Sequence, residues 1–576
     1  MVKKILSCLD KYTIYAILCP LFVVIETVLE VFIPFYMSKI IDVGMANGGD
    51  IAYISRMGGL MVAFAVLSLV CGAVAAHFAA RASAGLAKGI RKKIFDRIQD
   101  FSFANIDRFS TASLVTRITT DVTTTQQAFM MTIRSVVRSP VMLIVATVMA
   151  VRINWQLSTI FFVALPFLGA ILVIIAIRAF PRFKYMMKIY DKMNGSVQEN
   201  LAGIRVVKSF VRGDYESKRF AFSADEVKHA QIRAEKLLAW NMPVMQITMY
   251  GTITAIVWFG GRFIIGGMMT AGELMGFISY VSQILMSLMM LSMVFVLLIM
   301  SRASVARIAE ILDEVPDIAD DGTETTVSDG SVAFENVSFS YFKDENNVVL
   351  ENVSFSIAAG ETVGIVGGTG SSKTTLVQLI PRLYDVLGGT IRVGGKDVRQ
   401  YKVAALRQAV AMVLQKNVLF SGTILDNLRW GNQNATEEEV VNACKIAQAH
   451  AFISSFPDGY QTLLGQGGVN LSGGQKQRLC IARALLKTPK IMILDDSTSA
   501  VDTATDSKIR AALRGNHKDI TTIIIAQRIS SVCEADKIIV LDDGKINGIG
   551  THETLMRENA IYREVYESQQ EGKVTA

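Results

Sequence analysis

Charged residues are scarce in this chain. Asp, Glu, Lys and Arg make up 19% of its 576 residues, whereas 51% are hydrophobic and the mean hydropathy is +0.38. Ordinary soluble domains carry about 25% charged residues, so this composition excludes a typical soluble protein. It is also too charged for a chain built only of membrane spans. The composition therefore predicts two parts, one in lipid and one in water.

Cysteine is also rare, and no two cysteines have the spacing of a metal site. This excludes a disulfide framework and indicates a reducing cytosol for the C-terminal half. The net charge of +7 is modest, and basic cytoplasmic loops explain it better than nucleic-acid binding does. We therefore expect no nucleic-acid partner. The cysteines are Cys8, Cys19, Cys71, Cys444, Cys480 and Cys533.

Long apolar runs, in contrast, are plentiful, and six of them have the roughly 20 residues that a membrane-spanning helix needs. The first run follows a basic N-terminus, MVKKILSCLDKY. We interpret it as a retained span because it contains Glu26 and Glu30 and lacks the small-residue cleavage site of a signal peptide. The runs cover residues 15–38, 55–80, 128–151, 156–180, 241–267 and 273–300.

The loops between these runs alternate in length, and those after the second and fourth runs are long and basic. Basic loops stay on the cytoplasmic side, so we expect a multi-pass protein of the cell membrane with both termini in the cytoplasm. The long loops also have helical periodicity, which predicts helices that continue beyond the membrane. We expect their turns at 109–114 and 211–217.

An acidic, turn-rich stretch, VPDIADDGTETTVSDG, follows the last apolar run. It predicts a linker over residues 315–330 between a transmembrane domain (1–314) and a second domain (331–576). In the second domain, strand patterns alternate with helical ones. The expected fold is a multidomain membrane protein, with six transmembrane helices followed by an α/β domain.

The segment GIVGGTGSSKTTL (364–376) predicts a phosphate-binding loop between a strand and a helix. Glycines let backbone amides approach phosphate oxygens, a lysine reaches the terminal phosphates and a threonine hydroxyl binds magnesium. The strict pattern has glycine at position 372, where this chain has serine, so an ordinary glycine-rich turn stays open as an alternative. The candidate nucleotide-binding residues are Gly367, Gly368, Thr369, Gly370, Ser371, Ser372, Lys373, Thr374 and Thr375.

Two further segments, LSGGQKQR (471–478) and IMILDD (491–496), follow in order. With them, the chain resembles the ATP-binding cassette (ABC) transporter family, whose signature is LSGGQ. The resemblance covers essentially the whole chain. Tyr341 matches the aromatic residue that stacks on adenine, Gln415 the glutamine loop and SAVD (499–502) the D-loop. Six spans before one cassette resemble the layout of an exporter half-transporter.

The resemblance implies ATP and Mg²⁺ as ligands, and cassettes that pair head to tail. The signature residues would then contact ATP held by a second half-transporter; they are Ser472, Gly473, Gly474 and Gln475. Magnesium would be held by Thr374, Gln415 and Asp495. The catalytic positions of the family correspond to Asp496, Gln527 and Gln415.

This chain departs from the family pattern at several of these positions. Asp496 stands where the family has a catalytic glutamate, and Gln527 where it has a switch histidine. Ser372 and Gln466, the latter replacing a glutamate common in exporters, are further departures. Aspartate is one methylene shorter than glutamate, and a misplacement of about 1 Å costs on the order of 10²-fold in rate. Glutamine cannot carry the charge of an imidazolium.

We therefore expect a degenerate ATP site in one subunit of a heterodimeric exporter, with the intact signature serving a partner that has consensus catalytic residues. The expected cargo is hydrophobic or amphiphilic, of the multidrug type. Three alternatives stay open: a homodimer with slow ATPase, a lipid or peptide exporter, and an ATP-binding regulatory subunit that does not transport.

Charged residues inside the predicted spans are a further feature. Glu26 and Glu30 share a face of the first helix, as Arg134 and Arg138 do of the third. They are interpreted as an ion pair that locks two helices, as a wall that attracts cations, or as residues near the span ends.

The turns of the two long loops match the family's coupling helices. Their candidate contact residues are Phe109, Leu114 and Tyr215.

Overall fold

The computed structural model describes residues 2–45, 50–496, 501–516 and 519–574. They form two compact units. The first comprises the residues up to Gln99 together with Thr111–Glu314, and the second comprises Asp100–Ser110 together with Val315–Ala576. The short segment that joins two long helices of the first unit, residues 100–110, thus packs within the second unit.

The first unit is helical. Among the described residues, six helical runs are long and apolar enough to cross a membrane, as predicted. Its helices are α1 (Val2–Leu6), α2 (Thr13–Lys39), α3 (Ile51–Asp100), α5 (Thr111–Thr116), α6 (Val122–Met131), α7 (Val137–Ile153), α8 (Trp155–Ala202), α9 (Ile204–Ser209), α10 (Gly213–Ala239), α11 (Asn241–Ile265) and α12 (Ala271–Asp313).

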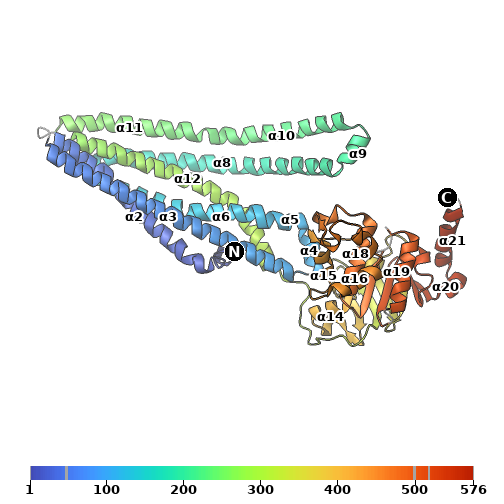
Figure 1. The fold of residues 1–576 in the computed structure, drawn as a ribbon. Helices are drawn as coiled ribbons and strands as arrows, with labels where there is room; N and C mark the ends of the chain where they lie inside the picture. Colours follow the sequence, from blue (N-terminus) through green and yellow to red (C-terminus); the bar gives the residue numbers. More distant parts are fainter. Residues whose placement is uncertain (1, 46–49, 497–500, 517–518, 575–576) are drawn as a thin grey trace. The chain divides into compact units, whose positions relative to one another are not determined.

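Several of these helices are much longer than a bilayer requires. Helix α3 has 50 residues and α8 has 48, which at 1.5 Å per residue is roughly 70–75 Å, against a hydrocarbon core of about 30 Å. Helices of this length have residues to spare beyond a bilayer, and their extension beyond the membrane stays a prediction. Helix α8 packs along α10 and α11, and α12 packs against α2, α6 and α7 (Figure 1).

The structure places the breaks in the long loops differently from the predicted turns at 109–114 and 211–217. In the first loop, Ser110 alone separates α4 (Phe103–Phe109) from α5, so residues 111–114 are helical. In the second, the break lies at residues 210–212, and the rest of the predicted turn is the start of α10. Leu114 is buried whereas Tyr215 is 59% exposed.

Three of the four intramembrane charges form one ion-paired group. The guanidinium of Arg138 donates to Glu26 Oε1 at 2.8 Å and to Glu30 Oε2 at 2.7 Å. The interpretation as an ion pair between two helices is thus confirmed, with a single arginine serving both acids. Glu26 is only 7% exposed, so this ion pair lies largely away from water.

The second unit is an α/β domain, as predicted. A four-stranded antiparallel sheet has the order β2-β1-β4-β5, and a six-stranded sheet has the order β12-β11-β3-β10-β9-β6. The strands are β1 (Val332–Phe339), β2 (Leu350–Ile357), β3 (Thr362–Val366), β4 (Gly388–Val393), β5 (Lys396–Asp397), β6 (Val410–Val413), β9 (Ile491–Asp495), β10 (Thr521–Ile525), β11 (Lys537–Asp542) and β12 (Lys545–Gly550), with a separate pair, β7 (Gly422–Thr423) and β8 (Leu463–Leu464).

Helices cover these sheets, and both faces of the parallel strands are buried, as their continuous apolar sequences predict. The helices of this unit are α4, α13 (Lys373–Gln378), α14 (Val403–Ala409), α15 (Ile424–Arg429), α16 (Glu437–Ile446), α17 (His450–Ser454), α18 (Gly473–Leu486), α19 (Thr503–Asn516), α20 (His552–Glu558) and α21 (Ala560–Val574).

The ion-paired group generates a prediction. Substitution Arg138→Leu leaves two carboxylates without their partner, one of them buried, and we expect it to destabilise the folded chain by about 3–5 kcal/mol. Thermal unfolding of the chain in lipid nanodiscs measures the effect. Arg134→Leu, on the same face but outside the group, is the matched control and is expected to have a small effect. Equal losses in both variants would contradict the pairing account.

Candidate functional site

The candidate site lies where parallel strands of the six-stranded sheet end. Strand β10 pairs in parallel with β3 and β9, so that Ile525 lies opposite both Ile365 and Asp495. Strand β6 pairs in parallel with β9. Carboxyl ends of parallel strands meet at one edge of a sheet, where doubly wound folds bind ligands. This edge gathers the phosphate loop, Gln415, the two aspartates and Gln527.

The phosphate loop contains one strained residue. Ser372 has φ 68° and ψ 22°, in the left-handed region that glycine adopts without cost. The strict motif therefore has glycine here for a physical reason, because glycine adopts this conformation without strain. The serine of this chain adopts the same conformation with backbone strain.

The side chain of Lys373 lies over this loop. Its ammonium donates to the carbonyl oxygens of Gly367 at 2.9 Å and Gly368 at 2.6 Å. Burial lowers the pKa of Lys373, while Asp495 and Asp496 oppose this change.

Thr374 and Asp495 form a pair suited to a hard cation. The Thr374 hydroxyl donates to Asp495 Oδ1 at 3.0 Å. Asp495 is 2% exposed, and within the described part of the chain its Oδ2 has no hydrogen-bond partner. Burial raises the pKa of Asp495, while the Thr374 hydrogen bond and the charge of Lys373 oppose this change.

Magnesium prefers such oxygen ligands, completed by phosphate and water. The donor set therefore fits Mg²⁺. No group of three or more His, Cys, Asp or Glu side chains suited to a metal occurs among the residues that the structure describes.

The three predicted catalytic side chains come together around Asp496. Its Oδ2 accepts from the amide of Gln527 at 3.0 Å and from that of Gln415 at 3.4 Å. Gln415, which the family resemblance also implied as a metal ligand, thus contacts Asp496. Burial raises the pKa of Asp496, and the Gln415 hydrogen bond opposes this change.

The backbone at Asp496 has φ 45°. Aspartate is enriched in this left-handed region relative to most other residues with a side chain.

Gln569 is a contact of the site that sequence reasoning missed. Its amide group donates to the Gln527 carbonyl oxygen at 2.8 Å and accepts from the Ile529 amide at 2.9 Å. It therefore fixes the turn that carries Gln527. A glutamine in a polar C-terminal helix gives no sequence signal for this role.

Tyr341, which is predicted to stack on adenine, lies beside the phosphate loop. Its hydroxyl is 2.7 Å from the Thr375 hydroxyl. Its ring makes edge contacts with Phe339 at 5.0 Å and Tyr384 at 5.2 Å between centroids. Tyr384 was not predicted as part of the site.

The signature segment opens α18. Ser472 and Gln475 form a capping box, in which the Ser472 hydroxyl accepts from the backbone N–H of Gln475 at 3.4 Å. In the described ranges, none of the hydrogen bonds of Ser472–Gln475 reaches the phosphate loop. Of the D-loop match, Ser499 and Ala500 lie outside the described residues.

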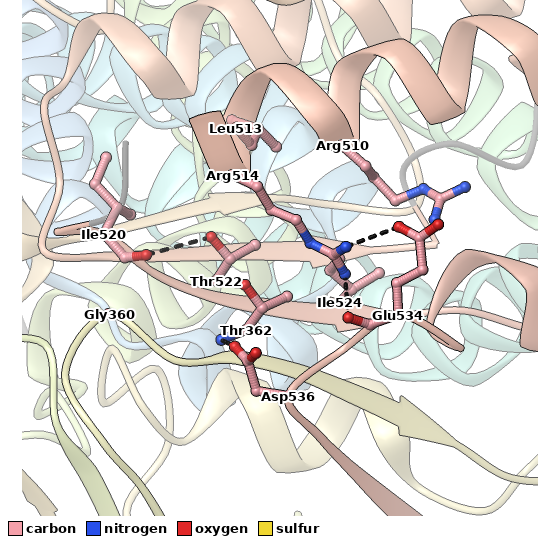
Figure 2. Close-up of a pocket in the computed structure, with 10 residues that line it drawn as sticks. All are labelled: Gly360, Thr362, Arg510, Leu513, Arg514, Ile520, Thr522, Ile524, Glu534 and Asp536. Carbon is pink, nitrogen blue, oxygen red and sulfur yellow. Dashed lines mark hydrogen bonds and ion pairs between the residues drawn. The ribbon is translucent and has the colours of Figure 1, made fainter. Parts of the chain in front are cut away.

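A different cavity, of about 320 Å³, lies at the opposite edge of the sheet, where β3 and β10 begin (Figure 2). Its charged groups have partners in the protein: Arg514 pairs with Glu534 at 2.7 Å, and Asp536 accepts from the Thr362 amide at 2.8 Å. These walls offer little unbalanced positive charge for a phosphate. The strand-end edge described above is the better nucleotide site.

Comparisons with known proteins agree with this architecture. The family model for the ABC transporter transmembrane region matches residues 16–288, and the ABC transporter model matches residues 350–499. The chain is 37% identical over 567 residues to the uncharacterized ABC transporter ATP-binding protein YfiB of Bacillus subtilis, covering 98% of each chain.

Over 502 residues, 85% of each chain, it is 32% identical to an ATP-dependent lipid A-core flippase of Desulfotalea psychrophila. A solved structure of a bacterial Atm1-family ABC exporter with ATP bound matches with a TM-score of 0.83 and 27% identity. That match covers 97% of this chain and 98% of the other.

The strain at Ser372 generates a prediction. A left-handed conformation costs a residue with a side chain roughly 1–2 kcal/mol. Glycine avoids this cost, but it loses more backbone entropy on folding, which offsets part of the gain. We expect Ser372→Gly to stabilise the second unit by about 1 kcal/mol, raising its unfolding midpoint by about 2–4 °C. Ser371→Gly is the control, because Ser371 donates to the Gly368 carbonyl oxygen at 2.9 Å and has no positive φ. A lower midpoint in both variants would contradict the strain argument.

Proposed function

Because this chain belongs to the ABC transporter family, as an exporter half-transporter with one transmembrane region and one cassette, we propose that it works as one half of a heterodimeric exporter. In this proposal its own ATP site is degenerate, and its signature completes the ATP site of a different partner subunit. Both termini and the cassette lie in the cytoplasm, and the spans lie in the cell membrane.

The observation that supports degeneracy is the environment of Asp496. A general base must present a carboxylate oxygen to the attacking water. Here Oδ2 of Asp496 already accepts from two neutral amides, those of Gln527 and Gln415. The side chain is also one methylene shorter than the family's glutamate. Because Gln569 fixes the turn at Gln527, this arrangement is held from two sides.

ATP binding at this site requires less than hydrolysis does. Lys373 would bind terminal phosphates, Tyr341 would stack on adenine, and Thr374 and Asp495 would hold Mg²⁺. The metal would neutralise charge on the phosphates. These contacts are made by side chains other than that of Asp496, so the site is suited to retain ATP.

The signature is the second part of the proposal. The glycines of Ser472–Gln475 expose backbone amides at the start of α18, which has 14 residues, and helix N-termini favour anions. The segment matches the family consensus, in contrast to Asp496 and Gln527. It would therefore supply donors to the γ-phosphate of a nucleotide bound by the partner.

The proposed cargo is hydrophobic or amphiphilic, of the multidrug type. An apolar cavity of about 660 Å³ lies between α8 and α12, with Ile177, Phe180 and Phe295 among its walls. Arg302 is the one charged residue of the described lining. The flippase relative is named for a lipid, so it supports amphiphilic cargo and the lipid-exporter alternative rather than the multidrug type.

ATP turnover tests the proposal. We expect the purified chain alone to hydrolyse ATP slowly while retaining bound nucleotide. The double variant Asp496→Glu/Gln527→His is expected to raise turnover about 10²-fold, because it restores the reach of the carboxylate and a chargeable side chain. Unfolding midpoints accompany the assay, since glutamate is less suited than aspartate to the backbone at position 496.

Asp496→Asn is the matched control, because it keeps the size of the side chain and removes the base. If the unaltered chain turns over at an ordinary rate and Asp496→Asn abolishes that rate, Asp496 is a working base. The protein would then be a self-sufficient homodimer, and the proposal of a degenerate site would be wrong.

A further inference from the structure

Helix α4 is joined by the chain to two membrane-spanning segments, α3 before it and α5–α7 after it. Within the second unit, one of the side chains that it contacts is Tyr384. The Tyr384 hydroxyl donates to Asp107 Oδ2 at 2.7 Å, and the rings of Tyr384 and Phe103 are 6.1 Å apart. Any displacement of Tyr384 therefore acts on α4 directly.

Tyr384 also contacts the proposed adenine-binding residue. It is 7% exposed, and its ring meets that of Tyr341 edge to face, at 5.2 Å and 87°. Phe339 packs against both rings, at 5.0 and 5.6 Å. Such a packed aromatic group transmits displacement, because close-packed side chains have few alternative positions.

The hydroxyls at the two ends of this group are fixed. Tyr341 bonds to Thr375 of the phosphate loop segment at 2.7 Å. Burial and the neighbouring Asp107 raise the pKa of Tyr384, so its hydroxyl stays protonated and keeps donating. A continuous series of contacts thus runs from Thr375 through Tyr341 and Tyr384 to Asp107.

We propose that Tyr384 is a positioning residue that reports an adenine base on Tyr341 to α4 through its hydrogen bond to Asp107. The inference rests on the proposed ATP site of this chain. It adds a means by which bound ATP influences the loop between two spans without being hydrolysed. The signal arises at the base rather than at the γ-phosphate, where Asp496 and Gln527 lie.

Other contacts also hold α4 against the rest of the second unit. They make it possible to remove the Tyr384–Asp107 bond without detaching α4. Asn105 donates to the Val315 carbonyl oxygen at 3.1 Å and accepts from the Asp317 amide at 3.0 Å. These bonds do not involve Tyr341 or Tyr384. Substitution Tyr384→Phe therefore removes the bond to Asp107 while leaving the aromatic packing and the Asn105 anchor.

The test is hydrogen exchange of the backbone amides of residues 103–110 in the full chain in lipid nanodiscs. It is run without ligand, with Mg²⁺ and ATP, and with Mg²⁺ and inorganic tripolyphosphate, which lacks the base. We expect ATP to slow this exchange about fivefold or more, a typical coupling between sites, and tripolyphosphate to leave it unchanged. In Tyr384→Phe and Asp107→Ala the response to ATP is expected to be lost.

Affinity provides a second readout. Coupling is reciprocal, so Tyr384→Phe weakens ATP binding by the same factor of about five and leaves tripolyphosphate binding unchanged. Asp107→Asn keeps an acceptor oxygen for Tyr384 and is expected to retain the response. Tyr562→Phe is the matched control, because Tyr562 is 1% exposed and its hydroxyl bonds to His552 at 2.8 Å, away from the site.

Three results would overturn the inference while the ATP site stands: an unchanged response in Tyr384→Phe with ATP bound, an equal response to tripolyphosphate, or an equal loss in Tyr562→Phe. Failure of the unaltered chain to bind ATP would instead overturn the proposed ATP site, and this inference with it.

Discussion

The register of four parallel strands determines where the chemistry of this protein can occur. Strands β3, β6, β9 and β10 end at one edge of the sheet, and Ile525 on β10 is level with Ile365 and Asp495 on its neighbours. A shift of this pairing by one residue would turn every side chain to the opposite face of the sheet. The phosphate loop, the Thr374–Asp495 pair and the Asp496–Gln527 contact all depend on this register.

Two adjacent aspartates at that edge have different surroundings. Asp495 ends β9, is almost fully buried and meets the Thr374 hydroxyl, whereas Asp496 meets the amides of Gln527 and Gln415. The first environment suits a metal ligand because it leaves a buried carboxylate oxygen for a cation. The second supplies hydrogen bonds from neutral groups, which hold the carboxylate in place without the charge of a histidine. The proposal of a degenerate site rests on this difference between the two aspartates.

Much of this arrangement was predictable from local sequence. Six apolar runs and the glycine-rich loop are continuous segments with their own physical meaning, and the departures at Ser372, Asp496 and Gln527 are visible in the sequence itself. The left-handed backbone at Ser372 shows the physical consequence of the first of these departures, which is backbone strain.

Contacts between distant segments were not predictable. Asp107 and Tyr384 are 277 residues apart, and Gln527 and Gln569 are 42 apart, so their meeting depends on tertiary packing. The sharing of Arg138 by two acids and the positions of the loop breaks near α4 and α9 have the same origin. Periodicity predicts that a helix exists more reliably than where it ends.

The central claim, which rests on the proposed degenerate site, is that this chain binds ATP at a site that hydrolyses it only slowly. The most direct measurement is the chemical state of nucleotide retained by the purified full chain. The chain is loaded with Mg²⁺ and ATP, freed of unbound ligand, incubated for hours, and its nucleotide is extracted and separated by chromatography. The account predicts that the retained nucleotide is still ATP. Conversion of the bound nucleotide to ADP within that time would contradict it.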